Sequence, residues 1–104
     1  MSEHKPKHYQ SIQARYPEFI RAVEGLGKAA MESGPLEPKT VQLIRLTAAA
    51  AMRSEGSVRS HARQALGAGA TPEEVEHALV ALTSTIGFPT VAAALSWVGR
   101  DEEA

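Results

Sequence analysis

The chain contains no cysteine, and it has little of several other residues that would indicate a function. Without thiols, it can form no disulfide and no thiolate metal site, and it can perform no cysteine redox chemistry. Aromatic residues make up 5% of the chain and the formal net charge is −1. Neither a nucleic acid nor an anionic membrane is therefore expected as a partner.

Long hydrophobic runs are also absent. No stretch approaches the ~20 apolar residues that a membrane-spanning helix requires. The N-terminal residues 1–7 lack the apolar segment of a signal peptide. The sequence therefore predicts a cytoplasmic protein without a membrane span.

The residues that are present fit one small globular domain. The chain has 104 residues, of which 43% are hydrophobic and 22% are charged. Apolar residues recur at three- and four-residue steps, and short alternating β-branched runs are absent. We predict an all-α fold, a bundle of about five to six helices. A single helical domain is expected over 9–100, between a flexible tail at 1–8 and an acidic tail at 101–104.

Prolines and a capping motif mark several helix boundaries. Pro17 should end a short first helix near Arg15 and begin the next one. Thr71, Pro72 and Glu74 form the pattern of a capping box at a helix start. The expected helical segments are 9–15, 17–33, 38–52, 54–68, 72–86 and 89–98.

Polar and ionisable residues gather at 54–61, between two strongly apolar helical segments. Ser57 and His61 are four residues apart, so they share one face of a helix. On one interpretation His61 lies at a partly buried pocket, with Ser57 bound to one ring nitrogen and Gln42 to the other. On the other interpretation the segment is an N-capped helix that carries a structural, hydrogen-bonded histidine. No metal site and no cofactor are expected, because His4 and His8 fit a solvated tail.

Several segments in order resemble the carboxymuconolactone decarboxylase family, which includes the alkylhydroperoxidase D-like proteins. The segments that carry the resemblance are Leu36–Thr40, the helix with Leu43 and Ile44, the stretch 54–75, and Gly87-Phe88-Pro89 before an alanine-rich last helix. The resemblance covers about residues 17 to 98. It implies an all-α, alkylhydroperoxidase D-like fold and a homo-oligomer, commonly a trimer or hexamer.

The peroxidase branch of that family uses two cysteines, a histidine and a glutamate. By the resemblance, these positions fall on Ser54, Ser57, His61 and Gln42, so only the histidine is kept. A serine hydroxyl cannot replace a low-pKa thiolate in peroxide reduction. Thiol-dependent peroxidase activity is therefore not expected.

The decarboxylase branch has an arginine two residues before the histidine and another two residues after it, which here are Arg59 and Arg63. The resemblance implies that one of them holds a small carboxylate ligand by paired hydrogen bonds while His61 moves a proton. Ser54, Ser57 and Gln42 would add hydrogen bonds. Alternatively, the arginines face solvent or pair with Glu55. The rival to an enzyme of decarboxylase or lactone type is a non-catalytic oligomeric binding or scaffold protein.

Overall fold

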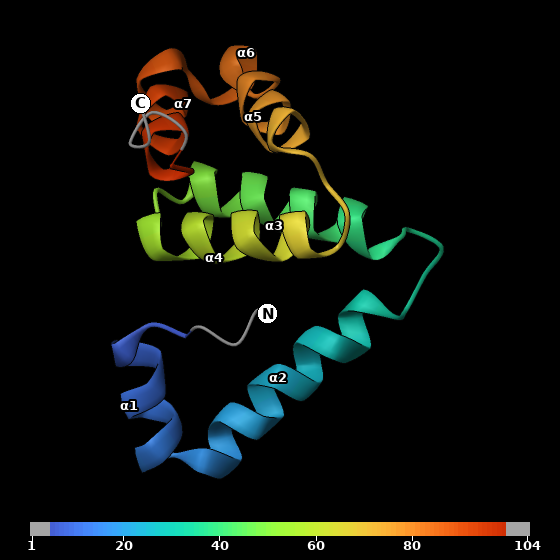
Figure 1. Ribbon diagram of the computed structural model, residues 1–104, viewed down its shortest axis with the longest axis vertical. Helices are drawn as coiled ribbons and strands as arrows, with labels where there is room; N and C mark the ends of the chain where they lie inside the picture. The colour runs from blue at the N-terminus through green and yellow to red at the C-terminus, as the bar shows by residue number, and fades with distance from the viewer. Residues whose placement is uncertain (1–4, 100–104) are drawn as a thin grey trace. The chain divides into compact units, whose positions relative to one another are not determined.

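The computed structural model describes residues 5–99, and every regular element in that range is a helix (Figure 1). The helices are α1 (Lys7–Arg15), α2 (Pro17–Met31), α3 (Pro38–Ala51), α4 (Glu55–Gly67), α5 (Pro72–Val80), α6 (Thr83–Ile86) and α7 (Phe88–Trp97). The predicted all-α class is confirmed. His4 and the predicted acidic tail at 101–104 lie outside the described residues.

The helices fall into two units that divide between Leu36 and Glu37. Helices α1 and α2 form the first unit, and α3 to α7 form the second. Helix α1 begins at Lys7, two residues before the start expected from the sequence. The segment expected as one helix over 72–86 is two helices, α5 and the single turn α6. Among the described residues, no helix is long and apolar enough to cross a membrane.

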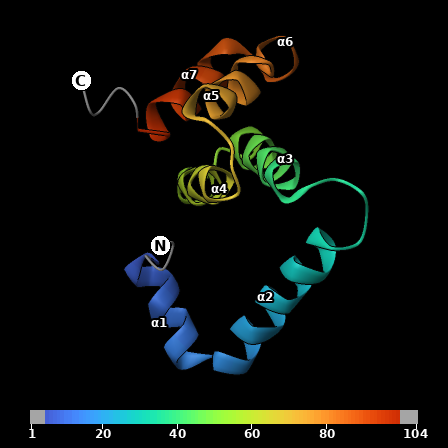
Figure 2. The ribbon, with the colours of Figure 1, turned by 45° about the vertical axis from the view of Figure 1, so that its right-hand side comes forward.

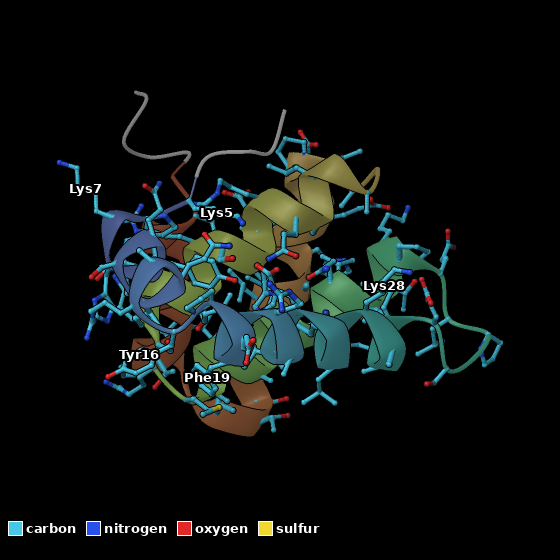
Figure 3. The ribbon with its side chains drawn as sticks, turned by 90° about the horizontal axis from the view of Figure 1, so that it is seen from below. Lys5, Lys7, Tyr16, Phe19 and Lys28 are labelled. Atoms are coloured by element: carbon cyan, nitrogen blue, oxygen red, sulfur yellow. The ribbon has the colours of Figure 1, made fainter. Side chains whose placement is uncertain are left out.

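In the first unit, Pro17 separates two helices at the predicted place. Helix α1 ends at Arg15, and Pro17 occupies the first turn of α2, where a backbone N–H has no helical partner to lose. The Tyr9 hydroxyl donates a hydrogen bond to the Glu24 carboxylate, and this bond raises the pKa of Tyr9 to about 12. Figure 3 shows Tyr16 and Phe19 close together at the junction of the two helices.

The second unit is built around α3 and α4, which lie side by side and antiparallel (Figures 1 and 2). Helices α5, α6 and α7 lie together on one side of this pair. The largest fully buried side chains are Leu46, Val58, Leu79 and Val91. They come from α3, α4, α5 and α7, so four helices close one core.

Alanines bring α3 and α4 close together. Ala49 and Ala50 on α3 and Ala62 and Ala65 on α4 are buried in the core. A methyl group occupies little space, so facing alanines allow two helix backbones to approach closely. Polar side chains on the flanks of these two helices are therefore within hydrogen-bonding reach of each other.

The turn between the two helices is tight. Arg53 has a φ of 58°, in the left-handed region that non-glycine residues rarely occupy. Its guanidinium Nη2 donates to Thr90 Oγ1 of α7 at 2.8 Å. This contact ties the turn to α7, and the turn places Ser54 at the start of α4.

The capping box of α5 forms as predicted. Thr71 Oγ1 accepts from the Glu74 backbone N–H, and the Glu74 carboxylate accepts from the Thr71 N–H, both at 3.0 Å. Ser54 occupies the N-cap position of α4 but makes no capping hydrogen bond with its side chain. Its hydroxyl is thus not used by the helix it precedes.

These two N-caps give a matched pair of substitutions. We expect Thr71→Ala to lower the free energy of unfolding by about 1 kcal/mol, because it leaves a helix N–H without its acceptor. Ser54→Ala should change it by much less, since no capping bond is lost. Urea unfolding followed by circular dichroism measures both. Equal losses in the two variants would contradict this account of the caps.

Candidate functional site

His61 lies on α4 on the side that faces α3. Its ring nitrogen Nδ1 is 2.9 Å from the side-chain oxygen Oε1 of Gln42. Gln42 is the one buried polar residue among those described, with 6% of its surface exposed. His61 of α4 and Gln42 of α3, which were expected to lie close together, are therefore joined by a direct hydrogen bond.

The hydrogen bonds continue beyond Gln42. Its Nε2 donates to Gln64 Oε1 at 3.1 Å, and Gln64 Nε2 donates to Ser60 Oγ at 3.0 Å. We call the series Ser60, Gln64, Gln42 and His61 the amide chain. Within residues 5–99, no buried side-chain nitrogen or oxygen lacks a hydrogen-bond partner. The amide chain thus satisfies the buried Gln42 side chain through neutral groups alone.

An open hollow of about 260 Å³ lies beside His61, between α3 and α4. We call it the His61 hollow. Its lining residues are Arg45, Ala48, Ala49, Met52, Ser54, Ser57 and His61. Alanine and methionine side chains provide an apolar part, while two hydroxyls, an imidazole and a guanidinium provide the polar part. The lining therefore combines an apolar surface with a few polar groups.

The structure brings together some of the predicted site residues. Ser54, Ser57 and His61 line the hollow, and Gln42 holds the histidine ring. Ser57, expected to bind a ring nitrogen, makes no hydrogen bond to His61 among the described contacts. Its hydroxyl is instead available to the hollow.

The two arginines of α4 lie elsewhere. Arg59 forms an ion pair with Glu55, with Nη2 at 2.9 Å and Nε at 3.0 Å from Oε2. Arg63 is exposed. Neither is among the residues that line the His61 hollow.

Arg45 of α3 supplies the cation of the hollow, and the sequence analysis did not select it. Gln42 and Arg45 are three residues apart, so they share one side of α3. Together with Thr47 they interrupt the otherwise apolar part of α3 from Val41 to Ala51. The spacing of these two polar residues within an apolar stretch could have predicted that both belong to one site.

The surroundings of His61 favour the neutral form of its ring. Burial lowers the pKa of His61 below its ordinary value, and the positive charge of Arg45 lowers it further. A neutral imidazole has one nitrogen that donates a hydrogen bond and one that accepts. Because Gln42 occupies Nδ1, Nε2 is the nitrogen left for a ligand in the hollow.

Metal binding finds no support in the described part of the chain. Among residues 5–99, no group of three or more histidine, aspartate or glutamate side chains is arranged to hold an ion. The polar groups around the hollow are hydroxyls, an imidazole and a guanidinium. A cation such as Arg45 repels metal ions and attracts anions.

The sequence and the fold of this chain are similar to those of known proteins. The sequence model of the carboxymuconolactone decarboxylase family matches residues 17–99. A solved structure of an apo carboxymuconolactone decarboxylase family protein from Legionella pneumophila is similar, with a TM-score of 0.78 and 26% identity. That match covers 93% of this chain and 87% of the other chain.

An uncharacterized protein from Haemophilus influenzae is 37% identical over 64 residues. The aligned stretch is 62% of this chain and 57% of the relative. The match therefore spans little more than half the length of that relative.

The effect of the Arg45 charge on His61 can be tested by substitution. Arg45→Gln should raise the pKa of His61 toward its ordinary value, because removing a nearby cation favours the imidazolium form. Burial should keep that pKa from rising fully. An NMR titration of the His61 ring protons gives the value.

Arg59→Gln is the matched control for this titration, because Arg59 is paired with Glu55 and lies outside the hollow. It should change the pKa of His61 far less. An equal rise in both variants, or a fall in the Arg45 variant, would refute the assignment of Arg45 to the His61 environment.

Proposed function

Because the chain belongs to the carboxymuconolactone decarboxylase family, we propose that the His61 hollow binds a small carboxylate and that His61 exchanges a proton with it. The observation that carries this proposal is that Arg45 and His61 line one hollow. One supplies a fixed positive charge, and the other supplies a ring that can gain and lose a proton near neutral pH.

Arg45 provides the contact for the carboxylate. A guanidinium can donate two parallel hydrogen bonds to the two oxygens of a carboxylate, so it both holds and orients the ligand. The Ser54 and Ser57 hydroxyls line the same hollow and can donate further hydrogen bonds. Ala48, Ala49 and Met52 leave an apolar surface for the carbon skeleton of the ligand.

His61 provides the acid and base. A neutral imidazole can take a proton from a carbon next to a carbonyl and then return it, as imidazolium, to a carbon of the product. Such a proton shuttle serves decarboxylation or the rearrangement of a carboxylated lactone. The lowered pKa of His61 suits this role, because the same surroundings favour the free base and make the imidazolium a stronger acid.

A thiol peroxidase is not a candidate. The chain contains no cysteine. By the resemblance, the two cysteines of the peroxidase branch fall on Ser54 and Ser57, and both serines line the hollow. A serine hydroxyl cannot form the disulfide that such a reaction produces. The proposed chemistry uses side chains of the protein alone and requires no cofactor.

A non-catalytic oligomeric binding or scaffold protein is the alternative function. Exposed apolar side chains bear on assembly, which both functions share. The large hydrophobic residues with the greatest exposure are Met52 at 78%, Leu26 at 71%, Phe88 at 64% and Phe19 at 60%. Exposed apolar side chains in such numbers are a common sign of a surface that contacts another chain. We propose a homo-oligomer, a trimer or hexamer, for either function.

Benzoate is a simple probe of the hollow, and benzamide is its uncharged control. We expect benzoate binding to raise the pKa of His61, because the bound carboxylate offsets the charge of Arg45. By linkage, benzoate should bind more tightly as the pH falls through the pKa of His61. Calorimetry at several pH values measures this dependence.

Arg45→Gln should weaken benzoate binding by about tenfold or more, since it removes charged hydrogen bonds. His61→Gln should instead remove most of the pH dependence, because His61 is the group that titrates. If benzamide bound as tightly as benzoate, or Arg45→Gln bound benzoate unchanged, carboxylate binding at this hollow would be wrong.

Catalysis requires a separate readout. Incubation in deuterated water with a small carboxylated lactone should place deuterium on a carbon of the ligand, and His61→Gln should abolish this exchange. Binding of the same lactone without deuterium exchange or carbon dioxide release would favour the non-catalytic alternative. Circular dichroism of His61→Gln shows whether the variant is folded.

The assembly is tested by light scattering at micromolar concentration. We expect a mass that is a multiple of the 11.1 kDa chain, because exposed apolar side chains are more stable when a partner covers them. A monomer at that concentration would contradict the proposed homo-oligomer.

A further inference from the structure

We propose that Gln64 and Ser60 are positioning residues for His61. Acting through Gln42, they hold the neutral ring as the tautomer with its proton on Nδ1, so that Nε2 meets the hollow as a base. Ser60 and Gln64 do not line the hollow. They lie one helical turn apart on α4 and act on the ring only through the amide of α3.

The amide chain has a direction because each glutamine has a different atom at each end. Ser60 Oγ accepts from Gln64 Nε2, so Gln64 presents its oxygen to Gln42. Gln42 therefore presents its Nε2 to Gln64 and its oxygen to the ring. An amide oxygen only accepts hydrogen bonds, so Nδ1 of His61 must carry the proton.

The opposite direction would reverse every donor and acceptor. Ser60 would donate to Gln64, Gln42 would turn its NH₂ group toward Nδ1, and the ring would carry its proton on Nε2. That N–H would then meet a hollow that already contains the Arg45 guanidinium. A donor that faces a cation is unfavourable, whereas a lone pair that faces it is favourable. The charge of Arg45 therefore favours the same direction that the amide chain holds, with Nε2 as the acceptor.

Because the amide chain consists of neutral groups, the tautomer of His61 should depend on residues that do not touch the ring. A carboxylate at position 42 would accept a hydrogen bond from Nδ1 whatever its other neighbours were. An amide can turn over, so its orientation depends on what Gln64 offers to its far end. Gln64 is exposed on α4, and its replacement should leave the core intact.

This inference rests on the proposed role of His61 as the base of the hollow, but its test observes the ring itself, without a ligand or an activity. The two can therefore fail separately. The protein is labelled with ¹⁵N in histidine and studied at about pH 8, where an ordinary histidine is neutral. The ¹⁵N chemical shifts distinguish the nitrogen that carries the proton from the nitrogen that does not. His77, exposed on α5, is an internal reference.

Two substitutions of Gln64 should have opposite effects. Gln64→Glu keeps an acceptor toward Gln42, so the Nδ1–H tautomer should remain. Gln64→Lys offers only donors, so Gln42 should turn its oxygen toward the lysine and its NH₂ toward the ring. The ratio of Nδ1–H to Nε2–H should then fall by about fivefold or more, the change that one ordinary hydrogen bond produces.

A double variant and a control complete the test. Gln42→Glu combined with Gln64→Lys should restore the Nδ1–H tautomer, because a carboxylate accepts from Nδ1 in either orientation. Gln10→Ala removes an exposed glutamine from α1 and should leave the ratio unchanged. The proposal is overturned if the unaltered protein has mainly the Nε2–H tautomer, or if Gln64→Lys keeps the ratio of the unaltered protein.

Discussion

The close approach of α3 and α4 is the constraint on which the rest of the site depends. Ala50 and Ala65, one on each helix, are fully buried in the core, and Ala49 and Ala62 are nearly so. Larger side chains at these positions would separate the helices or strain the core, at a cost of about 1–3 kcal/mol each. A separation of even 1 Å would lengthen the Gln42–His61 hydrogen bond beyond its useful range. The stability of the core and the geometry of the site therefore rest on the same small residues.

Local signals in the sequence were sufficient for several helix boundaries. Pro17 and the capping box at Thr71 and Glu74 act on backbone groups within one turn, so their effect can be read without the rest of the chain. The division of 72–86 into α5 and α6 was missed, because the apolar spacing continues across both helices. The contact between Gln42 and His61 was anticipated from the family resemblance, which relates residues on different helices.

The cation of the hollow could not be identified from neighbours along the chain. Arg59 and Arg63 are each two residues from His61, and two residues correspond to about 200° of rotation around a helix. They therefore cannot share a face with the ring, and the helix geometry alone argues against them. Arg45 lies on another helix, so only the packing of α3 against α4 shows that it lines the hollow.

The make-up of the hollow has a consequence for how it responds to acidity. Among the described residues that line it, the serine hydroxyls keep their protons and the guanidinium keeps its charge across the physiological range. The amides of Gln42 and Gln64 do not ionise either. The His61 imidazole is the lining group whose protonation varies, so the charge of the hollow depends on whether that ring carries one proton or two. The charge of the hollow should therefore follow pH as a sigmoid governed by His61, in contrast to the bell-shaped profile of a site that depends on two ionisable groups.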